Sequence, residues 1–121
     1  MPAMLTNLLG SGIIPPQPVS GLALIDSGAS MTTVEESALR ALGVQAVGIT
    51  QVRTPSGQAT QLLYPADIVF SGTALGRHSF TTVLGSPHLQ GQGIIALIGR
   101  DMLSRAIFTY NGPAGMFSLS F

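Results

Sequence analysis

The sequence predicts an all-β domain, built as a small closed barrel or folded sheet with one or two short helices. Fifteen glycines and eight prolines are spread along the 121 residues, and they divide the chain into short apolar runs, as is typical of strands joined by turns. Hydrophobic residues make up 45% of the chain, which is enough for a packed core. We therefore expect residues 1–121 to form a single domain.

The N-terminal part of the chain predicts two strands separated by a loop. Residues 3–9 form a weak candidate strand. Residues 10–21 are expected to form a loop because prolines disfavour both helix and inner strand. The apolar run 22–25 predicts a buried strand that ends at Asp26.

One helix is expected over residues 37–42, which are rich in alanine and leucine. Thr33 is placed to cap it, and Glu36, three residues later, can complete a capping box. Gly43 suits the left-handed position that ends a helix. Glu35 and Glu36 would then serve the start of the helix and its dipole.

The rest of the chain alternates strands and turns. The Thr-Pro-Ser-Gly sequence at 54–57 predicts a hairpin tip, with proline second and glycine fourth in the turn. A helical turn is expected at 100–105, followed by a terminal hairpin of residues 107–110 and 116–121. The remaining strands are expected over residues 46–53, 58–64, 66–71, 79–84 and 94–98.

Composition excludes several classes of function. Only 8% of the residues are charged and the formal net charge is zero, so there is no basic surface for a nucleic acid or an anionic membrane. The absence of cysteine excludes disulfides, thiol catalysis and cysteine-ligated metals. No apolar run approaches a membrane span, and the first ten residues lack the basic start of a signal peptide. We expect a soluble protein, with the cytoplasm as the favoured location.

Asp26 is the charged residue with the most chemical promise, because it closes an apolar strand and opens the sequence Asp-Ser-Gly-Ala-Ser. A carboxylate next to buried strand ends is costly unless it is hydrogen-bonded. A purely structural alternative is an Asx turn, in which Asp26 only caps nearby backbone groups.

Two motifs taken together favour a catalytic Asp26 over a purely structural Asx turn. Residues 23–30 (Ala-Leu-Ile-Asp-Ser-Gly-Ala-Ser) resemble the active-site signature of retropepsin-like aspartic proteases, and residues 96–103 (Ala-Leu-Ile-Gly-Arg-Asp-Met-Leu) resemble the second signature of that family. The resemblance extends over residues 22–121, whereas residues 1–21 match poorly. It is strongest to the single-domain bacterial group, whose chains end in a similar Tyr-Asn-Gly hairpin.

The resemblance implies a retropepsin-type fold and assigns roles to several residues. Asp26 would be catalytic, with Ser27 bracing the active site and Gly28 contacting the substrate through its backbone. No acidic residue follows the signature to pair with Arg100, which is therefore expected to bind backbone carbonyls. Substrate would bind as an added β-strand beneath a flap, at Ala29, Ser30, Ser56 and Gly57, with apolar pocket walls from Ala29, Val52, Leu84 and Ile95.

Peptide hydrolysis by carboxylates constrains the number of chains that must form the active site. One carboxylate activates water while a protonated one binds the scissile carbonyl, so two must lie close together and share a proton. Neither Asp67 nor Asp101 stands in an Asp-Ser/Thr-Gly setting. The second carboxylate is therefore expected from Asp26 of another copy, in a homodimer. This chemistry needs no cofactor and favours acidic pH. His78 and His88 lack a carboxylate at ligand spacing, so no metal site is expected.

Two other functions stay open at this stage. The chain could be a non-catalytic domain that dimerises and binds peptides, or a latent protease domain of a longer precursor. An intact Asp-Ser-Gly sequence argues against the first, since a binding module gains nothing from two facing aspartates.

Overall fold

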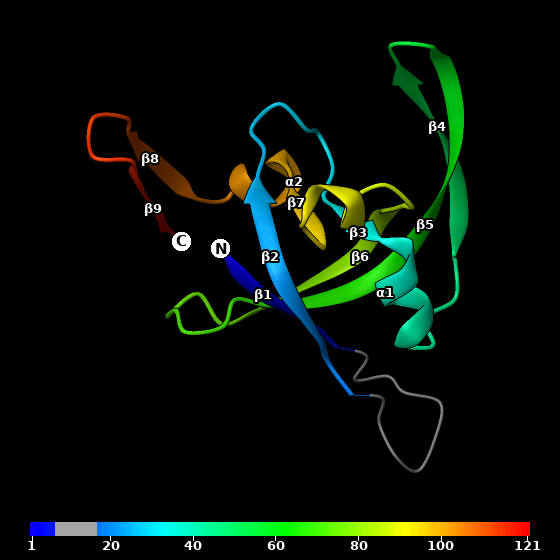
Figure 1. Cartoon of the computed structure of the whole chain (residues 1–121), viewed down its shortest axis with the longest axis horizontal. Helices are drawn as coiled ribbons and strands as arrows, with labels where there is room; N and C mark the ends of the chain where they lie inside the picture. Colours follow the sequence, from blue (N-terminus) through cyan, green and yellow to red (C-terminus); the bar gives the residue numbers. More distant parts are fainter. Residues whose placement is uncertain (7–16) are drawn as a thin grey trace.

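Residues 1–6 and 17–121 are described by a computed structural model. Within these residues, seven strands form one sheet in the order β1-β2-β7-β3-β6-β5-β4, and β8 and β9 form a separate two-stranded sheet (Figure 1). The elements are β1 (Pro2–Thr6), β2 (Val19–Ile25), β3 (Thr33–Glu35), α1 (Glu36–Ala41), β4 (Gly48–Thr54), β5 (Gly57–Val69), β6 (Arg77–Ser86), η1 (Gln90–Gln92), β7 (Ala96–Ile98), α2 (Arg100–Leu103), β8 (Ile107–Asn111) and β9 (Met116–Ser120). The predicted all-β class with short helices is confirmed.

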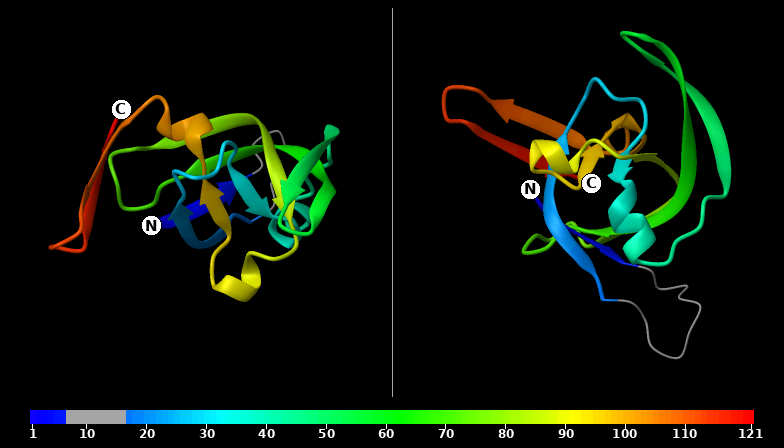
Figure 2. Two further views of the ribbon diagram at one scale, coloured as in Figure 1. Left: turned by 90° about the horizontal axis from the view of Figure 1, so that it is seen from above. Right: turned by 45° about the vertical axis from the view of Figure 1, so that its right-hand side comes forward.

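The large sheet folds back on itself because β1 has two neighbours. It pairs antiparallel with β2 along one edge and with β5 along the other. At the centre of the sheet, β7 pairs parallel with β2 and antiparallel with β3, and β3 pairs parallel with β6. The two views in Figure 2 show how the sheet curves around the middle of the molecule.

The core fills the inside of this folded sheet. Alternate residues of β5 and β6 point inward, and Leu39 and Leu42 close one side from the helical segment. Burial of apolar side chains supplies the main favourable term in folding. The largest fully buried side chains are Phe70, Leu5, Leu39, Leu42, Ile68, Ile98, Met102, Val34, Val83 and Thr32.

The long hairpin β4–β5 differs from the expected pair of shorter strands. Thr54 pairs with Gly57 across the tip, so the predicted turn is correct. The strands expected over 58–64 and 66–71, however, are one continuous strand, β5. Pro65 is accommodated where the register between β5 and β6 shifts, between Tyr64 and Ala66, and proline is tolerated at such irregularities.

The predicted start of the helix is wrong. Thr33 lies in β3, where it pairs with Leu84 and Leu97, and the helix begins at Glu36 after the N-cap residue Glu35. No side chain caps this helix. Sheet pairing on both sides of β3 outweighs the local capping signal, so the capping box does not form.

Near the N-terminus, the strand expected over 3–9 is present as β1, which ends at Thr6 within the described residues. The rest of that expected strand, with most of the expected loop 10–21, lies outside them. β2 begins at Val19, earlier than predicted, because Val19 pairs with Leu5.

The C-terminal elements follow the prediction closely. The helical turn α2 and the hairpin β8–β9 lie where the sequence places them, whereas the short elements β3 and η1 were not predicted. In the part of the chain that the structure describes, no helix has the length and apolar character needed to cross a membrane.

Candidate active site

Asp26 follows the last residue of β2, at the edge where β2 and β7 end side by side. Ile25 lies opposite Ile98, and the Asp26 backbone N–H donates to the Ile98 carbonyl at 2.9 Å, which extends the pairing by one residue. Asp26 is half-buried. The strand pairing therefore fixes the Asp26 backbone and leaves its side chain at the surface of the sheet end.

The Asp26 carboxylate is held on one side only. Its Oδ1 accepts the Gly28 N–H at 2.9 Å, and the Ala29 N–H donates to the Asp26 carbonyl at 3.2 Å. This is the Asx-turn geometry of the structural alternative. Oδ2, however, has no hydrogen-bond partner among residues 1–6 and 17–121. The turn orients the carboxylate and leaves one oxygen available.

Gly28 leaves room for this arrangement. A Cβ at this position would lie 3.1 Å from Asp26 Oδ1, which is tighter than an ordinary van der Waals contact. A larger residue would require the carboxylate to shift by a few tenths of an ångström.

Arg100, at the start of α2, clamps the loop that carries Asp26 (residues 26–32, the Asp26 loop). Its Nη1 donates to the Ser27 carbonyl at 2.9 Å, and its backbone N–H donates to the Ala29 carbonyl at 2.8 Å. The expectation that Arg100 binds backbone carbonyls is confirmed. The guanidinium thus donates to the backbone carbonyl of Ser27, where an acidic residue after the signature would have offered an ion pair.

Asp101 holds the far end of the Asp26 loop. Its Oδ2 accepts the Thr32 N–H at 2.9 Å, and its Oδ1 accepts both the Thr32 hydroxyl at 2.7 Å and the Met102 N–H at 2.9 Å. The buried Thr32 hydroxyl in turn accepts the Gly99 N–H at 3.1 Å. Bonds to an ionised acceptor are the strong ones, so this cluster ties the loop firmly to α2.

Gly99 allows the two segments to approach this closely. A Cβ on Gly99 would lie 2.6 Å from the Met31 carbonyl carbon, 2.7 Å from its oxygen and 3.0 Å from the Ala29 carbonyl oxygen. All three are backbone atoms, which cannot swing away as a flexible side chain can. The Gly-Arg-Asp sequence thus acts as one unit. Gly99 permits the close approach of the two segments, Arg100 binds the start of the Asp26 loop, and Asp101 binds its end.

The predicted substrate-binding residues occupy two separate elements at one end of the molecule. Ala29 is half-buried and Ser30 exposed in the Asp26 loop, while Ser56 and Gly57 are exposed at the tip of the β4–β5 hairpin. Gly57 has φ of 123°, a conformation that favours glycine. Figure 1 and the right view of Figure 2 show the hairpin tip and the loop at the same end, with the tip standing clear of the loop.

The predicted apolar pocket residues lie at separate places in the structure. The Leu84 N–H donates to the Thr32 carbonyl at 3.0 Å, which brings Leu84 next to the Asp26 loop. Val52 lies on the β4–β5 hairpin opposite Ala59. Ile95 lies beside Leu22, its N–H donating to the Leu22 carbonyl, and four residues of strand separate Leu22 from Asp26, about 13 Å. Ile95 is therefore not next to the carboxylate.

Two leucines beside Asp26 were missed by the sequence analysis. Leu24 is two residues before Asp26 on β2, so it lies on the same face of the strand, yet it is 50% exposed. Leu97 is its partner on β7. The apolar run 22–25 is continuous, so the sequence predicted a strand buried along its whole length and gave no signal that Leu24 would be exposed.

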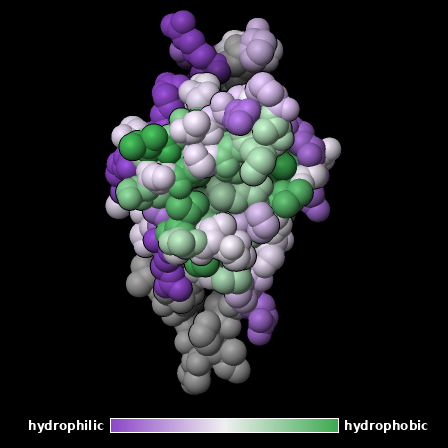
Figure 3. Space-filling model, turned by 90° about the vertical axis from the view of Figure 1, so that its left-hand side faces the viewer, coloured by the Kyte–Doolittle hydropathy of each residue, from purple (hydrophilic) through white to green (hydrophobic). Residues whose placement is uncertain are grey.

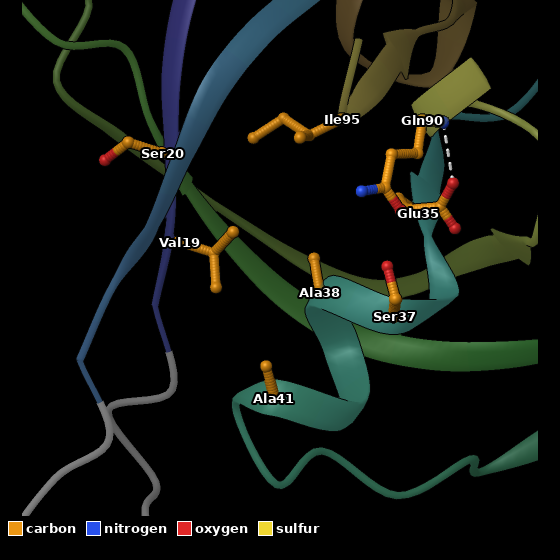
Figure 4. Close-up of a pocket in the computed structure, with 8 residues that line it drawn as sticks. All are labelled: Val19, Ser20, Glu35, Ser37, Ala38, Ala41, Gln90 and Ile95. Atoms are coloured by element: carbon orange, nitrogen blue, oxygen red, sulfur yellow. Dashed lines mark hydrogen bonds between the residues drawn. The ribbon is translucent and has the colours of Figure 1, made fainter. Parts of the chain in front are cut away.

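A hollow with a volume of about 290 Å³ lies at the other end of β2 (Figure 4). It contains Glu35, which is 3% exposed and whose Oε1 accepts the Gln90 N–H at 2.7 Å. Glu35 is the N-cap residue of α1, as expected at the helix start, and its side chain in addition fastens the turn η1. The hollow is lined by Val19, Ser20, Glu35, Ser37, Ala38, Ala41, Gln90 and Ile95.

The other acidic residues lie elsewhere in the fold. Of the five in the chain, Glu36 pairs with Arg40 at 3.7 Å, and Asp67 lies on β5 opposite Ser79. Within the described residues, no group of three or more histidine, cysteine or acidic side chains could hold a metal ion. One chain thus presents one carboxylate with a free oxygen at the end of β2.

The fold of the chain has a counterpart among solved structures. The chain is similar to the EIAV protease, a retroviral protease solved in complex with the inhibitor HBY-793, with a TM-score of 0.55 and 16% sequence identity over 87% of this chain and 84% of that one. The fold is therefore retropepsin-like. No protein-family model matches the sequence, and no curated protein matches it.

Proposed function

We propose that the chain is an aspartic endopeptidase, with a catalytic dyad formed by Asp26 from each subunit of a homodimer. The observation that carries this proposal is the half-buried Asp26 carboxylate, with one oxygen fixed by Gly28 and the other free, in a loop held at both ends by Arg100 and Asp101. The retropepsin-like fold supports it. Residues 1–121 would then form one retropepsin-like domain of the single-domain bacterial group.

The mechanism assigns two roles to two equivalent carboxyls. One Asp26 is ionised and takes a proton from the attacking water, while the other is protonated and donates to the scissile carbonyl oxygen. Ser27 follows Asp26, and its exposed hydroxyl has no partner among the described residues of its own chain, which suits a bond across the dimer. No metal or cofactor takes part.

The substrate would be an extended, apolar peptide segment. The Gly28 backbone, Ala29 and Ser30 lie beside the carboxylate, and the tip residues Ser56 and Gly57 would close over the peptide, which binds as an added strand. The exposed Leu24 and its neighbour Leu97 offer an apolar surface next to the reacting bond. A chain with so few charged side chains provides little to bind a charged substrate.

Cleavage of a diverse peptide library tests the proposal. Wild type and Asp26→Asn are compared at matched concentration, with sedimentation to establish that each is a dimer. We expect the variant to lose activity by about 1,000-fold or more while it remains folded. Activity at about pH 5 should exceed that at about pH 9 by at least about tenfold, because one carboxyl must carry a proton.

A folded wild-type dimer that cleaves nothing would contradict the proposal and favour a peptide-binding module. Equal cleavage by wild type and Asp26→Asn would remove Asp26 from the mechanism. Asp67→Asn is the matched control, since it makes the same substitution on β5, opposite Ser79, at a carboxylate that the proposed mechanism does not use.

A further inference from the structure

The hollow at the start of β2 has a polar end and an apolar end. Side-chain oxygen and nitrogen atoms gather at the polar end, from Glu35, Ser37 and Gln90 (Figure 4). The other walls are aliphatic and come from Val19, Ala38, Ala41 and Ile95. Ligand pockets are mostly apolar, with a few polar groups that orient the ligand. The hollow therefore suits a small molecule with a polar head and a hydrocarbon body.

The Glu35 carboxylate offers one free oxygen to such a ligand. The residue is 3% exposed, and its Oε1 accepts the Gln90 N–H at 2.7 Å. Its Oε2 has no hydrogen-bond partner among residues 1–6 and 17–121. Because Glu35 lines the hollow, this free oxygen is within reach of a molecule bound there.

No positive charge in the described part of the chain neutralises Glu35. It forms no ion pair there, and Arg40 of the same helical segment pairs instead with Glu36 at 3.7 Å. A buried carboxylate without a counterion is costly. A cationic ligand would supply the missing charge.

Backbone hydrogen bonds hold the walls of the hollow in place before any ligand binds. The Glu35 N–H donates to the Ile95 carbonyl at 2.9 Å, and the Ile95 N–H donates to the Leu22 carbonyl of β2 at 2.8 Å. On the η1 side, Leu89 is buried and its carbonyl accepts the Gln92 N–H at 2.9 Å. A preformed site loses less conformational entropy when it binds a ligand.

The apolar surface on another side of the molecule lacks this combination. Figure 3 shows hydrophobic side chains gathered on the side to which the β8–β9 hairpin belongs. Residues 106–121 contain no charged side chain, so the hairpin has no charged group with which to select a ligand. The hollow differs because aliphatic walls and a buried carboxylate lie together.

The polar groups of the hollow suit an ammonium ion better than a metal ion. An alkylammonium group has three N–H donors and no acceptor. The polar end offers three acceptors, namely the Glu35 carboxylate, the Ser37 hydroxyl and the Gln90 amide oxygen. Within the described residues, no group of three or more histidine, cysteine or acidic side chains could hold a metal ion.

We infer that the hollow is a binding site for a small aliphatic ammonium ion, with its charged head on Glu35 and its hydrocarbon body against the aliphatic walls. Hydrogen bonds between an ammonium group and a carboxylate are among the strong ones. The inference goes beyond the proposed function and does not rest on it, because the hollow lies at the opposite end of β2 from Asp26.

A titration followed by two-dimensional NMR at neutral pH tests the inference. The probe is cyclohexylmethylammonium chloride, and the matched neutral probe is cyclohexylmethanol. We expect the ammonium ion to bind with a dissociation constant of about 1 mM, and to shift amide signals at the start of β2, in α1 and in η1. The alcohol should bind at least about tenfold more weakly, because it lacks the charge.

Three variants locate the site. Glu35→Gln keeps the shape of the side chain and should raise the dissociation constant of the ammonium ion at least about tenfold. Glu36→Gln makes the same substitution at the neighbouring glutamate, which pairs with Arg40, and should change it by less than about twofold. Ala41→Leu fills the hollow from an exposed position without touching Glu35, and should weaken binding by about tenfold. It tests the site even where Glu35→Gln fails to fold.

Three results would overturn the inference: no shifts with the ammonium ion up to about 20 mM, equal affinity for the alcohol, or equal weakening by Glu36→Gln and Glu35→Gln. Its failure is separable from that of the proposed function. Ammonium binding that depends on Glu35, in a protein that cleaves no peptide, would support the site and contradict the protease. Cleavage that depends on Asp26, in a protein that binds no ammonium ion, would do the reverse.

Discussion

The Asp26 loop and the β8–β9 hairpin lie on either side of α2, yet their own chain supports them very differently. The loop is bonded at Ser27, Ala29 and Thr32 to the Gly-Arg-Asp sequence, and a glycine is needed for the close approach. Among the described residues, the hairpin is fastened only near its ends, and it leaves Tyr110, Met116 and Phe117 largely exposed.

This difference shows which part of the function each region can supply alone. A monomer can hold Asp26 in place, because the bonds that hold the loop come from the same chain. It cannot supply the second carboxylate that the proposed dyad requires. Changes in the loop should therefore alter the stability of the fold, whereas changes in the hairpin should leave the loop undisturbed.

The largest effect is expected for Gly99→Ala. The new methyl would lie 2.6 Å from the Met31 backbone, so the loop and α2 must separate, at a cost of about 3 kcal/mol in the free energy of unfolding. Gly112→Ala in the hairpin turn is the matched control, because its methyl meets only the Tyr110 ring at 3.6 Å. Urea unfolding measures both, and equal losses would contradict the contrast between the two regions.

A smaller loss is expected for Asp101→Ala, about 2 kcal/mol, because three donors lose their acceptor and two of them belong to the buried Thr32. Asp101→Asn keeps one acceptor oxygen and should lose about half as much. Chemical denaturation provides the measurement. Glu36→Ala removes a carboxylate paired at 3.7 Å with an exposed arginine, and it should cost less than about 0.5 kcal/mol. A loss for Glu36→Ala as large as that for Asp101→Ala would show that the loop contacts have no special weight.

A smaller loss than for Asp101→Ala is expected for Phe121→Ala, which removes the ring contact with His78 at a cost of about 1 kcal/mol. Amide hydrogen exchange should accelerate in β9 and stay unchanged in the Asp26 loop. Faster exchange in both regions, or in neither, would mean that the terminal contact does not anchor the hairpin separately from the active site.

Features with a local signal could be predicted from the sequence. The strand ending at Asp26 follows from an apolar run next to a polar turn, and the tip at 54–57 from its proline and glycine. The terminal hairpin likewise follows from two apolar runs around Asn-Gly-Pro-Ala-Gly. In each case the residues that define the feature are within a few positions of one another.

Features that depend on distant pairing could not be predicted in this way. Thr33 has a good local environment for a helix cap, but pairing with β6 and β7 places it in a strand. Pro65 reads as a break between strands, but the shifted register of β5 accommodates it. The bonds between Thr32 and Asp101 join residues 69 positions apart, so Asp101 gave only the signal of a helix start.

A subunit-mixing assay tests most directly the claim that two copies share one active site. Wild type at fixed concentration is mixed with a ninefold excess of Asp26→Asn, under conditions where sedimentation shows both to be dimers that exchange subunits. If the dyad takes one Asp26 from each chain, most wild-type chains enter inactive heterodimers, and cleavage should fall to about a tenth of its starting rate. Cleavage that stays at its starting rate would mean that each chain acts alone, and it would contradict the shared dyad.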